Sequence, residues 1–251
     1  MDLVPGYREF APGVTFKDEI HCLWVSVTPA CGAQRAPVLP DACTDLIWQS
    51  GVGAFVAGPD TGPVPADVPP GTVLVGARFR PGAGGAALGV PLSELLDLRV
   101  NAADLPAVPG QLLPGSLPPA DALRRIAGIA ARMVTERPPD QLVLEAARLL
   151  GRPGARAEQA AERLAISERQ LRRRCQAAVG YGPRTLTRVL RFRRFLSGID
   201  AGSTDLAALA ADAGYADQAH LTRESTRLAG LPPAALARSR RPSRSGGCGP
   251  R

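Results

Sequence analysis

The sequence has few histidines, which many metal sites require, and no long apolar run, which a membrane span requires. Its 251 residues include only two histidines, His21 and His220, which lie far apart in the chain. We therefore expect no histidine-rich metal site. No apolar run approaches 18 residues and no leader pattern opens the chain, so we expect no membrane partner and a cytoplasmic location.

Cysteine is scattered and odd in number. The five residues are Cys22, Cys31, Cys43, Cys175 and Cys248, and no Cys-x-x-Cys occurs. This pattern favours reduced thiols over a disulfide framework. A thiol-reactive sensor built on one of the first three cysteines remains an alternative, although inert buried cysteines are the commoner case.

Basic residues are concentrated in the second part of the chain. Residues 1–150 hold 11 Arg and Lys against 15 Asp and Glu, whereas residues 151–251 hold 19 against 8. A basic C-terminal part behind a mildly acidic N-terminal part indicates a polyanion-binding module joined to a unit of another kind.

Residues 167–180 form a pattern typical of a recognition helix. Ser167 is a suitable N-cap and Gly180 a suitable C-terminal stop. Leu171 and Cys175 fall on one helical face, while several arginines point away from it. A short amphipathic helix at 157–164 comes before this stretch, and a tight turn separates the two. This arrangement predicts a helix-turn-helix unit over about 157–180. An ordinary helical hairpin with a solvated basic face is the alternative.

A second copy of the pattern follows at a shift of 50 residues. The shift aligns residues of the same type, namely Leu171 with Leu221, Gly180 with Gly230 and Pro183 with Pro233. It predicts a second unit over about 205–230, joined to the first by a helix from 183 to about 196. Two recognition helices on such a spacer could enter adjacent major grooves on one face of a duplex.

We expect DNA contacts from exposed polar residues of both units. The candidates are Arg169, Gln170, Arg172, Arg173, Arg174, Arg184, Arg188, Gln218, Thr222 and Arg223. Arginine forms bidentate bonds to guanine, so the arginines of the first recognition helix are expected at base edges. Arg174, Arg184 and Arg188 are assigned to phosphates instead.

Four stretches carry a family resemblance. They are Ser167-Glu-Arg-Gln-Leu-Arg-Arg173, Gly180-Tyr-Gly-Pro183, Ala213-Gly-Tyr-Ala-Asp-Gln-Ala-His-Leu-Thr-Arg223 and Gly230-Leu-Pro-Pro233. With them, residues from about 140 to 238 resemble the DNA-binding domain of the AraC/XylS family of transcription regulators. The resemblance implies a sequence-specific regulator that binds double-stranded DNA, with RNA polymerase as a further possible partner.

The sequence departs from this family at two core positions. The family usually has phenylalanine four residues after the recognition-helix leucine, where this chain has Cys175 and Ser225. Replacing a buried phenylalanine by a small residue costs about 3–5 kcal/mol when nothing compensates. We therefore expect a weakened core, above all at Ser225, whose hydroxyl needs a partner. Binding through one unit alone stays an open alternative.

The N-terminal part is expected to be rich in short strands. Runs at 21–27, 46–48, 55–60 and 72–79 are separated by turns rich in Pro and Gly, which favours a small barrel or sandwich. The predicted class is α+β, a β-rich small barrel or sandwich domain followed by an all-α domain with two helix-turn-helix units. The expected divisions are a regulatory domain at 1–115, a connecting helix at 116–138, the DNA-binding domain at 139–239 and a disordered basic tail at 240–251.

A second resemblance covers about residues 5–105. Its carriers are Leu39-Pro-Asp-Ala-Cys-Thr-Asp-Leu-Ile-Trp48, Val56-Ala-Gly-Pro-Asp-Thr61 and Val75-Gly-Ala-Arg-Phe-Arg-Pro-Gly82. They resemble an N-terminal domain fused to AraC-type DNA-binding domains in bacteria, notably actinobacteria. The resemblance implies a regulatory, effector-sensing or dimerising part. It leaves open both the oligomeric state and the identity of any small-molecule effector.

Enzyme chemistry is weakly supported. Gly82-Ala-Gly84-Gly-Ala-Ala87 matches a dinucleotide fingerprint only loosely, because no clear βαβ unit follows, and we expect no cofactor. Asp41, Asp45 and Asp60 either line an effector pocket or cap turns. No Ser/His/Asp or Cys/His arrangement is evident, so we expect no catalytic residues and no enzyme. The alternative is a thiol-reactive or enzymatic N-terminal domain tethered to DNA by the C-terminal domain.

Overall fold

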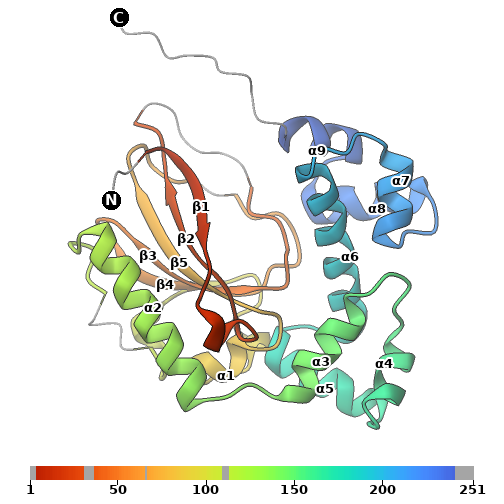
Figure 1. Ribbon diagram of the computed structural model, residues 1–251, viewed down its shortest axis with the longest axis horizontal. Coiled ribbons are helices and arrows are strands. Elements are labelled where there is room, and N and C mark those ends of the chain that lie inside the picture. The colour runs from red at the N-terminus through yellow and green to blue at the C-terminus, as the bar shows by residue number, and fades with distance from the viewer. Residues whose placement is uncertain (1–3, 31–36, 66, 109–112, 241–251) are drawn as a thin grey trace, which may run out of the picture.

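Six strands form one antiparallel sheet in the N-terminal part of the chain (Figure 1). The computed structural model describes residues 4–30, 37–65, 67–108 and 113–240. The strands are β1 (Gly6–Phe10), β2 (Ile20–Val27), β3 (Thr44–Gln49), β4 (Gly53–Ala57), β5 (Val73–Phe79) and β6 (Arg99–Asn101). Their order is β1-β2-β5-β3-β4-β6, which places β1 and β6 at the edges.

A helix covers one face of this sheet. Helix α2 (Pro119–Glu136) buries an apolar face that includes Ile126 and Met133, in the same core as Trp48 and Phe79. Full burial of one such side chain contributes about 1.5–3 kcal/mol. The indole of Trp48 also donates a hydrogen bond to the carbonyl oxygen of Pro114, at 2.9 Å. Helix α2 therefore packs into the N-terminal domain, and it supplies the second layer that a sandwich would take from another sheet.

Short helical turns complete the N-terminal part, and seven helices follow α2 in the described part of the chain. The turns are η1 (Val14–Phe16), α1 (Gly84–Leu88), η2 (Leu92–Glu94) and η3 (Ala102–Asp104). The helices are α3 (Gln141–Leu150), α4 (Ala157–Arg163), α5 (Glu168–Val179), α6 (Pro183–Asp200), α7 (Leu206–Ala213), α8 (Gln218–Ala229) and α9 (Pro233–Arg240). The predicted α+β class with two helix-turn-helix units is confirmed.

The helical part consists of two copies of a 50-residue unit. Helix α5 falls on α8 at this shift, and α9 falls on the first eight residues of α6. The last ten residues of α6 fall on α3. Each unit therefore runs through a lead helix, a helix-turn-helix and an end helix, over 141–190 and 191–240. Helix α6 is the end helix of the first unit and the lead helix of the second, without a break.

Glycine ends both recognition helices. Gly180 follows α5 with φ of 92°, and Gly230 follows α8 with φ of 71°. These left-handed conformations favour glycine, since a Cβ would be strained there. The repeated glycine therefore reflects a repeated backbone geometry.

The two small core residues are both fully buried. Cys175 and Ser225 each have 0% exposure, and the Ser225 hydroxyl donates a 2.7 Å hydrogen bond to the carbonyl oxygen of Leu231. The buried hydroxyl therefore has the partner that it needs.

Among the described residues, no helix is both long and apolar enough to cross a lipid bilayer. The predicted basic tail falls, apart from Arg240, outside the described residues, as do Cys31 and Cys248.

We predict that Ser225→Ala destabilises the helical domain. The change leaves the Leu231 carbonyl oxygen without its buried partner, which should lower the free energy of unfolding by about 1–3 kcal/mol. Denaturant unfolding of the full chain measures it. The control is Ser197→Ala, because Ser197 is exposed and donates only to the carbonyl oxygen of Arg193 in its own helix. Equal effects of the two changes would contradict the prediction.

Candidate nucleic-acid interface

Helix α5 presents a row of arginines away from the core. Its start is fixed by a capping box, in which the Ser167 hydroxyl accepts from the Gln170 amide and the Gln170 side chain accepts from the Ser167 amide. Arg169, Arg172 and Arg173 are exposed. The structure thus leaves three of the predicted base-contacting arginines available to a ligand, while the side chain of Gln170 is held by the cap.

Helix α8 presents an equivalent exposed face. The Asp217 carboxylate accepts from the amide of His220 at 2.6 Å and so caps the helix. Gln218, Thr222 and Arg223 are exposed, and the hydroxyl of Thr222 donates to the carbonyl oxygen of Gln218 in the preceding turn. Under the 50-residue shift, Thr222 and Arg223 correspond to Arg172 and Arg173. Both recognition helices therefore expose the same two positions.

Two of the three predicted phosphate contacts have close partners inside the protein. Arg174 forms an ion pair with Asp140, the N-cap of α3. The Nε of Arg188 lies 2.9 Å from a carboxylate oxygen of Glu224 on α8. Arg184, by contrast, has a side chain that is 87% exposed and lies 3.9 Å from Glu158. Only Arg184 of these three is free enough to bind a phosphate without breaking a close internal contact.

An open groove of about 750 Å³ runs along the base of α5 and the start of α6. Its lining includes Arg169, Arg172, Tyr181 and Arg184, together with Leu96 of the N-terminal domain. The groove brings residues of the first recognition helix next to the other domain.

The N-terminal domain packs directly on the C-terminal half of α5, beside α1 in Figure 1. A Cβ at Gly85 of α1 would lie 2.9 Å from the carbonyl oxygen of Ala177, and one at Gly180 would lie 2.6 Å from Pro59. Ala42 of the N-terminal domain is buried in the same apolar core as the helical units. The first recognition helix is therefore partly held by the other domain.

This packing also explains the glycines that follow β5. A Cβ at Gly84 would lie 3.0 Å from Thr44, and Gly85 faces the backbone of α5. Helix α1 spans only five residues. The close approach of neighbouring elements accounts for these glycines without a dinucleotide.

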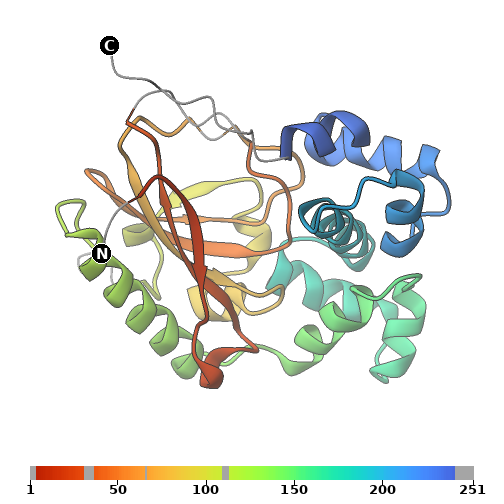
Figure 2. The ribbon, with the colours of Figure 1, turned by 45° about the horizontal axis from the view of Figure 1, so that its top comes forward.

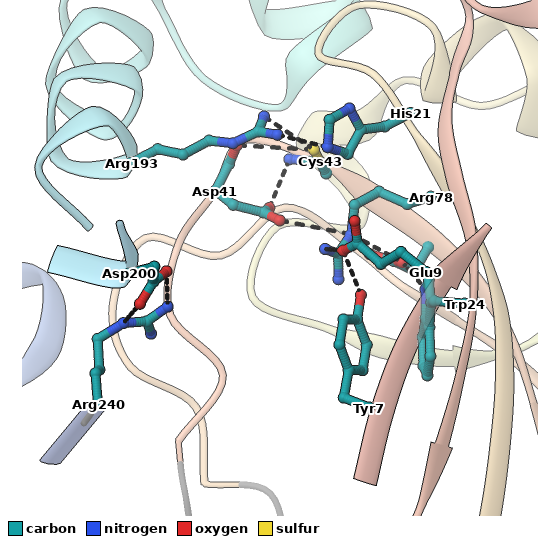
Figure 3. Close-up of polar contacts among 11 residues, drawn as sticks. Tyr7, Glu9, His21, Trp24, Asp41, Cys43, Arg78, Arg193, Asp200 and Arg240 are labelled. Atoms are coloured by element: carbon teal, nitrogen blue, oxygen red, sulfur yellow. Dashed lines mark hydrogen bonds and ion pairs between the residues drawn. The ribbon is translucent and has the colours of Figure 1, made fainter. Parts of the chain in front are cut away.

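A polar network lies on the sheet face that points toward α6 (Figure 3). Arg78 of β5 contacts Asp45 at 3.2 Å and Asp41 at 3.6 Å. The indole of Trp24 donates a 2.6 Å hydrogen bond to Asp45. Burial raises the pKa of the Asp45 carboxyl above its usual value, and Arg78 opposes the rise. Asp45 is thus held by structural partners.

One arginine of α6 joins the helical domain to this network. Arg193 lies 2.9 Å from Nε2 of His21 and 3.7 Å from the sulfur of Cys43. Burial, and then the charge of Arg193, lower the pKa of His21 to about 4. His21 is therefore neutral near pH 7 and can accept a hydrogen bond from the guanidinium. This contact was not predicted, because no local pattern links residues so far apart.

The predicted aspartates all have partners within the protein. Asp41 accepts from the amide of Cys43 at 2.8 Å, as a turn cap does. Asp60 binds Arg99 through two hydrogen bonds of 2.9 and 2.8 Å. These contacts support the structural interpretation of the aspartates over that of a pocket lining.

The described thiols of the N-terminal domain are poorly suited to reaction. Cys22 and Cys43 are buried. Burial raises the pKa of Cys22 to about 12 and holds the pKa of Cys43 well above its usual value, so little thiolate forms at neutral pH. Cys22, His21 and Glu9 place three potential metal-ligand atoms within 4.8 Å of one another. Arginines already contact both His21 and Glu9, however, and their charge opposes a cation there.

Comparison with protein families matches both parts of the chain. Residues 160–239 match the family model described as a helix-turn-helix domain. Residues 8–101 match the family model described as a domain of unknown function (DUF6597). The comparison with curated proteins returned no match.

Solved structures of ToxT from Vibrio cholerae are similar over most of their length. ToxT from strain O395 is 12% identical with a TM-score of 0.47, over 85% of this chain and 95% of that chain. Wild-type ToxT from strain SCE256 with a bound unsaturated fatty acid is 11% identical with a TM-score of 0.45, over 86% and 94%. Similarity at this level supports no conclusion about a ligand.

We predict that Gly85→Ala loosens the contact between α1 and α5. The added methyl meets backbone atoms that cannot move aside, so the free energy of unfolding should fall by about 1–3 kcal/mol. Hydrogen exchange in residues 175–180 of the full chain should also quicken. The control is Gly128→Ala in α2, where a Cβ meets nothing within 4 Å; it should stabilise the chain by about 0.5–1 kcal/mol. Unchanged exchange at residues 175–180 in Gly85→Ala would refute the proposed close contact.

We also predict that Cys22 and Cys43 resist alkylation in the folded chain. Their burial and raised pKa should slow iodoacetamide labelling at pH 7.5 by about a hundredfold or more relative to the denatured chain. Mass spectrometry resolves each cysteine peptide. Fast labelling of either residue in the native state would instead revive a thiol-reactive N-terminal domain.

Proposed function

We propose, from the premise that the chain joins a DUF6597 domain to an AraC-type helix-turn-helix domain, that it binds two adjacent major-groove segments of one duplex. The domain pair identifies a DNA-binding transcription regulator. The finer proposal assigns one segment to α5 and the next to α8. Its partner is double-stranded DNA with a bipartite recognition sequence.

The repeated exposed face is the observation that carries this proposal. Arg172 and Arg173 on α5 occupy the same positions as Thr222 and Arg223 on α8, and all four side chains are exposed. An arginine forms two hydrogen bonds to guanine. A threonine hydroxyl can form a hydrogen bond to any of several bases, and its methyl group can contact the methyl group of thymine. The two segments of DNA should therefore differ in sequence, with a guanine opposite Arg173 and another opposite Arg223.

The remaining polar residues divide by their surroundings. Arg169 and Gln218 are exposed in the first turns of their helices and are proposed as further base contacts. Arg184 stands in the first turn of α6 and is proposed as a phosphate contact. The internal partners of Gln170, Arg174 and Arg188 favour structural roles for these three.

A regulatory role for the N-terminal domain is supported by its contact with α5. A small molecule or a second copy of the chain that moved α1 would also move the recognition helix, because Gly85 lies against its backbone. Such a ligand would change DNA affinity only by its different affinities for the two arrangements.

We predict that Arg173→Ala weakens binding to the selected DNA site by about 1–3 kcal/mol and relaxes base choice at one position. Arg223→Ala should do the same in the second segment. Titrations with the selected duplex, single-base variants and random DNA measure both effects. Arg184→Ala is the matched control, because loss of a phosphate contact should weaken all duplexes alike and reduce the salt slope by about 0.9. Equal losses of Arg173→Ala on selected and random DNA would exclude base recognition.

A further inference from the structure

Helix α6 contacts every part of the second helix-turn-helix unit along its length. We infer that Arg188 of α6 and Glu224 of α8 are positioning residues that set the separation of the two DNA segments. The inference rests on the proposed two-segment binding and adds the residues that fix its geometry. It gives Arg188 a role different from the phosphate contact that the sequence predicts.

The ion pair is well placed to hold the recognition helix. The Nε of Arg188 lies 2.9 Å from Oε2 of Glu224, and the two side chains are only 28% and 14% exposed. A pair with so little solvent contact is screened less by salt than a surface pair is. Loss of one partner would leave the other charge partly buried and unpaired. The contact therefore favours one orientation of α8 against α6.

The first unit has an ion pair at the equivalent position of its recognition helix. Glu224 corresponds to Arg174 under the 50-residue shift, and Arg174 pairs with Asp140 at the start of α3. Helix α3 in turn corresponds to the second part of α6. In the first unit the ion pair joins the recognition helix to the N-cap of the lead helix. In the second unit it joins the recognition helix to the helical turn just before the lead helix. The recognition helix supplies the arginine in the first unit and the glutamate in the second. The partner residue of one unit could therefore not pair with the recognition helix of the other.

Further contacts fix the second unit along α6. The guanidinium of Arg191 lies 5.5 Å from the centre of the Tyr215 ring, which is in the turn before α8. Arg194 donates a 2.8 Å hydrogen bond to the carbonyl oxygen of Ala213 at the end of α7, where the helix dipole favours a cation. A Cβ at Gly198 would lie 2.3 Å from the side chain of Leu209, so α7 packs directly on α6.

The C-terminal end of α6 also contacts the second unit. Arg240 of α9 binds Asp200, the last residue of α6, through hydrogen bonds of 2.8 and 2.6 Å (Figure 3). The second unit is therefore held at intervals along the last four turns of α6. Of these contacts, only the Arg188 pair reaches the recognition helix itself.

This arrangement predicts how loss of the Arg188–Glu224 ion pair would affect DNA binding. Helix α6 is about 27 Å long and acts as the spacer between the units. If Glu224 loses its partner, α8 can change its orientation, and the chain should accept segments at altered separations. Overall affinity depends on net charge as well, so the preference for the native separation is the informative quantity.

The experiment uses the full chain and a set of duplexes. The bipartite site selected by the unmodified chain is rebuilt with one or two base pairs inserted or removed between its segments. Variants are Arg188→Glu, Glu224→Arg and the double swap R188E/E224R. The single changes shift net charge by two in opposite directions, and the swap leaves it unchanged. Arg238→Glu is the control, because Arg238 is exposed on α9 and has no ion pair in the described part of the chain.

In both single variants, the ratio of affinity for the native separation to affinity for altered separations should fall about tenfold. This ratio should fall whether or not overall affinity changes. The swap should restore most of it, and the control should keep it. Two results would overturn the inference. One is an unchanged preference in both single variants. The other is a swap that stays weak on all duplexes with a salt slope reduced by about 0.9, which would make Arg188 a phosphate contact.

A second measurement separates this inference from the proposed function. Hydrogen exchange in α8 of the DNA-free chain should quicken in each single variant and recover in the swap. If the unmodified chain selects no bipartite DNA, the proposed function fails, and with it the role in setting the separation. The exchange data would then still decide whether the pair holds α8, and exchange that is equal in all variants would refute that contact role as well.

Discussion

The helical domain depends on one continuous helix that belongs to two units at once. The first half of α6 completes the core of the first unit and the second half begins the core of the second. Four fully buried side chains line this helix, those of Leu186, Val189, Phe192 and Phe195. Burial of each contributes about 1.5–3 kcal/mol to the stability of the fold. Because no break interrupts α6, the two recognition helices cannot move independently without loss of packing or ion pairs.

The N-terminal domain adds a second constraint on the same helices. Its sheet is covered on one side by α2, and its other side lies toward α6, as Figure 2 shows. Arg193 crosses from α6 to His21, while α1 and η2 lie against α5. The N-terminal domain therefore contacts the recognition helix of the first unit and, through Arg193, the lead helix of the second unit. The packing of α1 and η2 on α5 gives the N-terminal domain a direct physical connection to the first recognition helix.

The sequence was most informative where the chain is locally regular. Helix caps and the 50-residue shift predicted both helix-turn-helix units, and apolar runs predicted four of the six strands. Strand β1 was missed because all five of its residues are exposed, so its pairing with β2 leaves no apolar pattern. The phosphate assignments of Arg174 and Arg188 did not anticipate their partners. Asp140 and Glu224 are more than 30 residues away from them, and only the packed structure brings these charges together.

The most direct test of the account is selection of DNA by the full chain from a random pool at moderate salt. Two recognition helices held on one rigid spacer should enrich sequences with two blocks of defined bases. The centres of the blocks should lie about one helical turn, or 10 base pairs, apart. Enrichment of a single block, or of two blocks at variable separations, would contradict the account.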